Sequence, residues 1–215
     1  MKLKQLLNNI KRKKAHLLRE NGIKRKRYDR DAAKSYAEDY AEIGNNNKYP
    51  LFKDNDCTNF VSQVLHAGGM NMEGNIYNKQ DNWFCRTTNS SNLYDVSLTW
   101  RSAKYFRRYW GNDNGVGCNK ANKFITITVL EALNNFENIF EILDIGDVIQ
   151  YGDPKNNNYP YHSQVIHAKE YNPVLNINDL FVAQHSVNKK HVSFYDYLKL
   201  LQDKDKRYIY LYHFD

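Results

Sequence analysis

The sequence has few cysteines and no long apolar run. Its 215 residues include only three cysteines, Cys57, Cys85 and Cys118. An odd and sparse set of this kind argues against a disulfide framework and fits a reducing compartment. No stretch approaches the roughly 18 consecutive apolar residues that a membrane-spanning helix needs. Beyond short asparagine runs there is no repeat or low-complexity tract, so the sequence predicts an ordinary globular chain without a transmembrane segment.

The start of the chain also lacks an export signal. Its first twenty residues, MKLKQLLNNIKRKKAHLLRE, contain no uninterrupted apolar core of signal-peptide length. On this ground we expect a cytoplasmic location. The chain length suits one ordinary domain or one domain with an appendage.

Positive charge is confined to one end of the chain. The net charge is +7, but residues 1–30 hold twelve Lys or Arg and two acids, a net of +10. The other 185 residues hold nineteen basic and twenty-two acidic residues, a net of −3. The body of the protein therefore gives no general electrostatic case for nucleic-acid binding, which we consider unlikely.

Residues 1–27 form a basic N-terminal segment with leucines near helical spacing. The resulting amphipathic helix has three interpretations: it packs on the domain, it lies on an anionic surface such as a membrane or wall polymer, or it contacts nucleic acid. Asn21 and Gly22 interrupt the pattern and serve as a helix stop. We expect residues 28–215 to form the main domain.

Two helices are predicted before residue 70. In the first, small and aromatic residues recur every four positions, at Ala32, Ala33, Tyr36, Ala37, Tyr40 and Ala41. Asp29 or Asp31 suits its N-cap and Gly44 its end. The second begins at Cys57 and ends at Gly68, and its apolar positions are Phe60, Val61, Val64 and Leu65. A short helix is also predicted within 97–110, SLTWRSAKYFRRYW.

The second half of the chain reads as strands. Short β-branched and aromatic runs, with turn residues between them, lie at 146–151, 162–171, 179–187 and 207–214. Helices followed by strands indicate an α+β domain with a C-terminal antiparallel sheet.

Cys57 is the first candidate for chemistry, because it stands at the start of a predicted helix. Unpaired N–H groups and the positive end of the helix dipole stabilise a thiolate there, which can lower the thiol pKa from about 8.5 to below 7.5. The backbone N–H of Cys57 is also placed to hold an oxyanion. The alternative is a packed thiol, since Cys57 shares a helical face with Val61 and Val64.

A cysteine nucleophile needs a base, and histidine is the usual one. Four of the seven histidines are poorly placed. His16 lies in the basic segment, His213 lies near the end of the chain, and His191 follows NKK in an expected turn. His66 is more than two turns from Cys57 on the same helix.

The other three histidines, His162, His167 and His185, fall on predicted strands. His162 and His167 are five residues apart, so on one regular strand they face opposite sides and only one can reach the site. His185 could pair with either across the sheet, while its neighbour Gln184 faces the other way. The alternative for each is a histidine with a purely structural role.

Several motifs, in this order along the chain, resemble the Putative amidase domain family of Gram-positive bacteria, which lies within the papain-like cysteine-peptidase superfamily. They are YDRDAAKSYAEDYA (28–41), NDCTNFVSQVLHAGG (55–69), TWRSAKYFRRYW (99–110), GDVIQY (146–151), HSQVI (162–166) and VAQHS (182–186). The resemblance implies a papain-like fold in which N-terminal helices carry the nucleophile and pack on the C-terminal sheet. It implies Cys57 as nucleophile, His162 as general base and His185 as the residue that orients the imidazole.

The resemblance also implies a function. We expect a cysteine-dependent amidase or peptidase acting on cell-wall peptide, a peptidoglycan-like substrate, or a related short peptide, without cofactor or metal. A lysis system could release such an enzyme to the wall. Asn55 or Tyr49 could supply a second oxyanion donor, and Asp56 is expected to cap the helix. The alternatives are a non-catalytic binding module that binds anionic polymers through residues 1–27, and a nucleic-acid binder that works through the same segment.

Overall fold

One six-stranded antiparallel sheet organises this computed structural model, which describes residues 28–111, 115 and 117–215. The strand order is β1-β6-β2-β3-β4-β5. The strands are β1 (Lys123–Thr128), β2 (Val148–Asp153), β3 (Tyr159–Asn172), β4 (Ile177–Gln184), β5 (Lys189–Ser193) and β6 (Tyr208–His213). The basic segment 1–27, with its expected amphipathic helix, lies outside the described residues.

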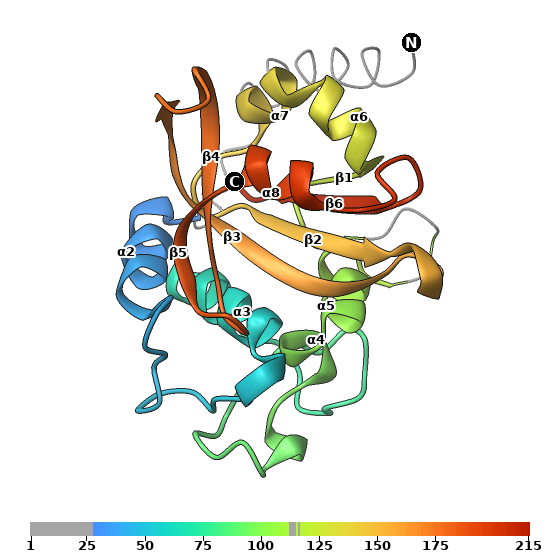
Figure 1. The fold of residues 1–215 in the computed structure, drawn as a ribbon. Coiled ribbons are helices and arrows are strands. Elements are labelled where there is room, and N and C mark those ends of the chain that lie inside the picture. The colour runs from blue at the N-terminus through green and yellow to red at the C-terminus, as the bar shows by residue number, and fades with distance from the viewer. Residues whose placement is uncertain (1–27, 112–114, 116) are drawn as a thin grey trace, which may run out of the picture.

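Helices cover both faces of the sheet (Figure 1). One face carries α2 (Arg30–Tyr40), α3 (Cys57–Ala67), α4 (Leu98–Arg101) and α5 (Ala103–Trp110). The other carries α6 (Val129–Asn134), α7 (Phe136–Ile142) and α8 (Phe194–Leu200). Three 3-10 turns are η1 (Lys53–Asn55), η2 (Leu93–Asp95) and η3 (Pro154–Asn156). The expected α+β class, with helices preceding an antiparallel sheet, is confirmed.

The first two described helices form where the sequence places them. The Asp29 side chain accepts a hydrogen bond from Ala32 N at 3.0 Å and caps α2. Ala33 and Ala37 are fully buried, and their small size lets α2 approach α3 closely. Helix α3 buries every residue from Cys57 to Leu65 and ends at Gly68. A helix that is buried all round must be held by neighbours on several sides, and this fixes where Cys57 lies.

Each face of the sheet has its own hydrophobic core. Val148, Val165 and Ala183 pack with α2, α3 and α5, whereas Ile149, Ile166 and Val182 pack with α6 to α8. Alternate residues of one strand therefore enter different cores, as the period of a strand requires. Because both faces are covered, residues 162–168 of β3 are all buried.

The expected strands correspond to β2, β3, β4 and β6. The strands β1 and β5 and the helices α6 to α8 are additional elements that the patterns of the sequence did not predict. The region expected as a helix at 97–110 is divided at Ser102 into α4 and α5.

Candidate active site

Helix α3 begins at Cys57 and meets the sheet with its first turn. The hydroxyls of Thr58 and Ser163 are hydrogen-bonded at 2.9 Å, which joins α3 to β3. Gln150 of β2 donates to the same Ser163 hydroxyl, also at 2.9 Å. The Cys57 side chain is buried, with 7% of its surface exposed. The start of the helix is thus anchored on the residue that follows His162.

The Cys57 thiol lies beside Ser163, in the part of β3 that precedes its pairing with β4. The pairing of β3 with β4 begins at Val165, opposite Ala183, and β4 ends at Gln184. Beyond that point β3 continues beside β2. The backbone N–H of Ser163 acts on the Cys57 sulfur as a hydrogen-bond donor. The thiol therefore lies against the part of β3 that carries His162.

The protonation of Cys57 differs from the sequence-based expectation. Burial raises the pKa of the Cys57 thiol, and the Asp56 carboxylate adds to the rise. The Thr58 hydroxyl and the backbone N–H groups of Ser163 and Thr58 act in the opposite direction. Because desolvation is the largest influence, the expected lowering of the pKa by the helix terminus is wrong for this closed site.

His162 is held by Gln184 across the β3–β4 pair. The imidazole Nε2 lies 3.1 Å from Gln184 Oε1. The Gln184 amide nitrogen donates to the carbonyl of Val187 at 3.0 Å, and a carbonyl can only accept. The amide oxygen must then face His162, so Nε2 carries the proton. In the neutral ring this leaves Nδ1 as the basic nitrogen.

Gln164 completes this network. Its amide nitrogen donates to Gln184 Oε1 at 2.5 Å, and its own oxygen accepts from the Tyr151 hydroxyl. Tyr151 is fully buried between the sheet and α8. The oxygen that fixes the tautomer of His162 is thus itself fixed by a second amide and, through it, by a buried phenol.

Aromatic rings surround the imidazole. Tyr151, Tyr161 and Tyr197 lie with their ring centroids 6.0, 6.4 and 6.4 Å from that of His162. Burial lowers the pKa of His162, and the hydrogen bond to Gln184 opposes this. Burial likewise raises the pKa of Tyr197, and Tyr161 and the Cys57 sulfur raise it further. Tyr197 therefore neighbours the imidazole.

His185 does not meet His162. It is fully buried, with Nδ1 2.5 Å from Asp56 Oδ2 and Nε2 2.8 Å from the carbonyl of Tyr40. Its ring stacks on Phe60 of α3 at 4.2 Å between centroids. The position expected for His185, beside the imidazole of the base, is held by Gln184, the last residue of β4; His185 follows the strand and faces α3.

Asp56 takes the N-cap position of α3, but its side chain does not cap the helix. Instead its Oδ1 accepts from Phe52 N at 2.8 Å and from Asn59 Nδ2 at 2.9 Å. Its own backbone N–H donates to Ser186 Oγ at 2.8 Å. Asp56 is therefore a buried tie between the loop before Cys57 and the end of β4.

The other histidines lie elsewhere. His167 is on β3 as well, but its Nδ1 is 3.3 Å from Glu38 of α2, and a register shift interrupts the strand there. Burial lowers the pKa of His167, and the hydrogen bond to Glu38 opposes this. His66 contacts the carbonyl of Met70, and His213 contacts Asp147. His167 thus faces α2, whereas His162 faces Tyr197 of α8, which agrees with the expectation that the two histidines face opposite sides.

The two residues considered as second oxyanion donors lie apart from each other. Asn55 is exposed at the end of η1. Tyr49 is buried, and its ring stacks on Trp100 at 5.7 Å. Burial raises the pKa of Tyr49, and Cys85 adds to this; the two residues line the same surface pocket.

Two further observations bear on the class of protein. Among the described residues, no three His, Cys, Asp or Glu side chains are grouped so that they could hold a metal ion. Within the same part of the chain, no helix has the length and apolar character needed to cross a bilayer.

Comparison with known proteins gives the family. The family described as Putative amidase domain matches residues 27–212. The chain belongs to this family. The match covers α3 with Cys57, β3 with His162, β4 and nearly all of the remaining sheet, and the family's description suggests amide hydrolysis.

Two relatives come from Bacillus subtilis (strain 168). Uncharacterized protein YhbB is 38% identical over 85 residues, which is 40% of this chain and 24% of the relative. Uncharacterized protein YjcM is 58% identical over 45 residues, which is 21% of this chain and 11% of the relative. The chain thus aligns with a quarter or less of either relative. No solved structure matches it significantly.

Sequence reasoning missed two members of the site. The sequence correctly predicts that Gln184 and His185 face opposite sides. The residue that faces His162, however, is Gln184 and not His185. Tyr197 lies on α8, an element without a clear sequence signal. The sequence signal that could have found Gln184 is the presence of a glutamine on each of two neighbouring strands, Gln164 and Gln184. Two amides placed in this way are suited to hold a ring nitrogen.

Proposed function

We propose that this protein is a cysteine-dependent amide hydrolase, an amidase or peptidase, with a papain-like arrangement of its site. Cys57 is the nucleophile, His162 the general base and Gln184 the residue that orients the imidazole. The observation that carries the proposal is the fixed tautomer of His162, whose Nε2 faces Gln184 at 3.1 Å while the thiol contacts the adjacent Ser163. In this proposal His185, the residue that the resemblance favours, supports Asp56 instead.

The reaction is acyl transfer to water. Nδ1 of His162 takes the proton of the Cys57 thiol as the sulfur attacks the amide carbonyl, which becomes a tetrahedral oxyanion. The backbone N–H of Cys57 donates to this oxyanion. The C–N bond then breaks, and the amine leaves with the proton from His162. A thioester remains on Cys57.

Water completes the cycle. His162 removes a proton from the water molecule as its oxygen attacks the thioester carbonyl. The C–S bond breaks, the acid product leaves, and the proton returns to the sulfur. Gln184 accepts a hydrogen bond from Nε2 throughout, so the ring keeps one orientation while it gains and loses a proton at Nδ1.

The proposed substrate is a short peptide, with cell-wall peptide as the first to examine. Purified full-length protein is incubated with wall-derived peptides and with synthetic tripeptide amides, and new amines and acids are identified by mass spectrometry. We expect hydrolysis by the wild type, and its loss in Cys57→Ala and in His162→Ala. Cys118→Ala is the matched control, because that thiol is only partly buried and lies outside the site. Hydrolysis that persists in Cys57→Ala would refute the proposal.

A non-catalytic binding module is the second candidate function. The observation that favours it is the burial of Cys57, which raises the thiol pKa and keeps the thiolate fraction low at neutral pH. In that case the protein would bind peptide without forming any product, and Cys57→Ala would leave the peptide affinity unchanged.

A further inference from the structure

A cavity of about 350 Å³ lies beside the loop that leads into the nucleophile helix. Its walls come from three places: the loop 51–55, Ser90, and Arg101 at the end of α4. The lining residues are Leu51, Phe52, Lys53, Asn55, Ser90 and Arg101. Two of these side chains are cationic and none is acidic, so the cavity carries positive charge.

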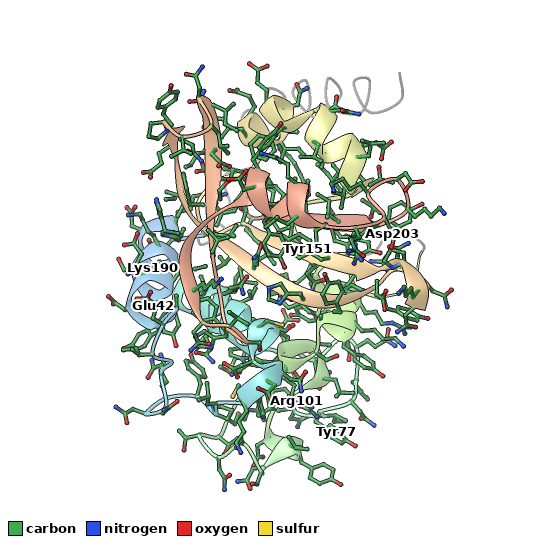
Figure 2. All side chains as sticks on the ribbon, in the orientation of Figure 1. Glu42, Tyr77, Arg101, Tyr151, Lys190 and Asp203 are labelled. Carbon is green, nitrogen blue, oxygen red and sulfur yellow. The ribbon has the colours of Figure 1, made fainter. Side chains whose placement is uncertain are left out.

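Neither cation is neutralised by a carboxylate in the described part of the chain. Arg101 donates from Nε to the carbonyl of Val96 at 3.4 Å, a long bond that leaves its other donors available. Burial lowers the pKa of its guanidinium and the nearby Tyr77 hydroxyl opposes this (Figure 2). Across the described residues, no ion pair within 4 Å involves Arg101 or Lys53. Asp56, the buried acid that follows the loop 51–55, is already paired with His185.

The position of the cavity connects it to the site. Asn55, one of its walls, is two residues from Cys57 in the chain, so their Cα atoms are at most about 7.6 Å apart. Helix α4 is fixed to the same turn of α3, since Trp100 Nε1 donates to Asn59 Oδ1 at 2.8 Å. The cavity and the thiol therefore belong to one rigid part of the molecule.

We propose that this cavity is a substrate subsite that binds a carboxylate group close to the scissile amide, with Arg101 and Lys53 as its ligands. An extended peptide advances about 3.3–3.6 Å per residue, so the carboxylate lies roughly one to three residues from the bond that Cys57 attacks. A planar guanidinium matches a carboxylate with two parallel hydrogen bonds. The carboxylate comes either from the C-terminus of the peptide or from an acidic side chain.

This inference rests on the proposed function only for the placement of the scissile amide at Cys57. Binding of the carboxylate can be measured without turnover. The full chain with Cys57→Ala is titrated with three probes: Ala-Ala-Ala as the free acid, Ala-Ala-Ala with a C-terminal amide, and Ala-Glu-Ala with a C-terminal amide. The dissociation constant is measured by calorimetry, and the Arg101 Nε–H signal is followed by ¹H–¹⁵N NMR. The same titrations are repeated with Arg101→Gln, Lys53→Gln and Lys79→Gln added to Cys57→Ala.

We expect at least one carboxylate probe to bind on the order of tenfold more tightly than the neutral amide and to shift the Arg101 signal. Arg101→Gln and Lys53→Gln should each reduce this preference. Lys79→Gln removes the same charge from an exposed lysine outside the cavity and should not. The free acid and the glutamate peptide show which source of carboxylate the cavity takes.

Equal binding of all three probes, no binding by any, or a preference that survives Arg101→Gln would overturn the subsite. Lys53→Gln keeps the test valid if Arg101→Gln fails to fold, because Lys53 is exposed. If the carboxylate preference is found while the wild type hydrolyses no amide, the subsite stands and the proposed function falls.

Discussion

At the residue scale, burial moves the pKa values of Cys57 and His162 in opposite directions. The thiol pKa rises above its ordinary value near 8.5, so at neutral pH the sulfur is protonated. The imidazole pKa falls below its ordinary value near 6.5, so at neutral pH the ring is uncharged. Both shifts favour a neutral pair at rest, and the proton then moves to His162 only as the sulfur attacks.

This neutral pair predicts how Cys57 reacts with iodoacetamide. In the substrate-free protein, alkylation of Cys57 should be slow at pH 7 and should rise only above about pH 8.5, because the thiolate forms late. Peptide mass spectrometry across a pH series measures the rate, and urea-unfolded protein supplies the unperturbed titration as control. A rate plateau that is already reached below pH 7 would show a preformed thiolate–imidazolium pair instead.

Gln184 offers a second prediction at this scale. Gln184→Glu places a carboxylate beside His162 Nε2, which stabilises the imidazolium and raises the pKa of His162. His162 acts as a base only when neutral, and activity is lost as pH falls through its pKa. The acid limb of kcat/KM should therefore move to higher pH, by roughly one unit or more.

The matched control for this variant is Gln164→Glu, which adds the same charge one contact further from the ring. Its acid limb should move less. An unchanged acid limb in Gln184→Glu would mean that Gln184 does not neighbour the catalytic base.

At the element scale, Asp56 and His185 fasten the start of α3 to the end of β4. Both ring nitrogens of His185 face acceptors, the Asp56 carboxylate and the carbonyl of Tyr40. The two contacts hold the ring in one orientation between the loop before α3 and the end of α2. The ring also stacks on Phe60 of α3, with 4.2 Å between the centroids.

Removing the Asp56 carboxylate leaves Phe52 N–H, the Asn59 amide and the buried His185 ring without this partner. We expect Asp56→Ala to lower the free energy of unfolding by about 3–5 kcal/mol, measured by urea denaturation. Asp54→Ala, two residues away and exposed, is the control and should change stability by less than about 0.5 kcal/mol. If the two variants were equally stable, the pair would contribute nothing to the position of Cys57.

Elements with strong periodicity and clear ends could be predicted from the sequence. Gln184, the partner of His162, could not. Helix α3 begins at Cys57 and ends at Gly68 as its apolar spacing indicates. At the end of β4, alternation correctly separates Gln184 from His185, the residue that follows the strand. It cannot tell which of them meets His162, because helices cover both faces of the sheet and each face is equally apolar in the sequence.

At the scale of the whole molecule, Tyr28 joins the helices to the sheet. Its ring fits against Gly68 at the end of α3 and against Gly146 just before β2, and its hydroxyl donates to the Gly146 carbonyl at 3.1 Å. A Cβ atom at Gly68 would lie 2.2 Å from the Tyr28 ring. The glycine is needed here for close approach, since its φ of −69° is open to any residue.

Gly68→Ala should therefore destabilise the protein by about 1–3 kcal/mol, as overpacking of a core does. Thermal or urea unfolding measures the loss. In a Tyr28→Ala background the same substitution should cost much less, because the ring that it meets is gone. Equal costs in the two backgrounds would show that Tyr28 and Gly68 are not in contact.

The layered architecture is only half visible in the sequence. The helices before residue 111 and the strands β2, β3, β4 and β6 carry clear periodicity. Helices α6, α7 and α8 are six or seven residues long, too short for two full amphipathic repeats. Tyr197 enters the site from one of these short helices, and for that reason it was not among the predicted site residues.

The most direct test of the central claim is to trap the acyl group on the nucleophile. Full-length wild type is mixed with p-nitrophenyl acetate, quenched in acid, digested and examined by mass spectrometry, beside His162→Ala and Gln184→Ala. The account predicts an acetyl thioester on Cys57 in the wild type, with much slower formation in His162→Ala and an intermediate rate in Gln184→Ala. Acetylation that is absent from Cys57, or equally fast in all three proteins, would contradict the assignment of Cys57 and His162 as nucleophile and base.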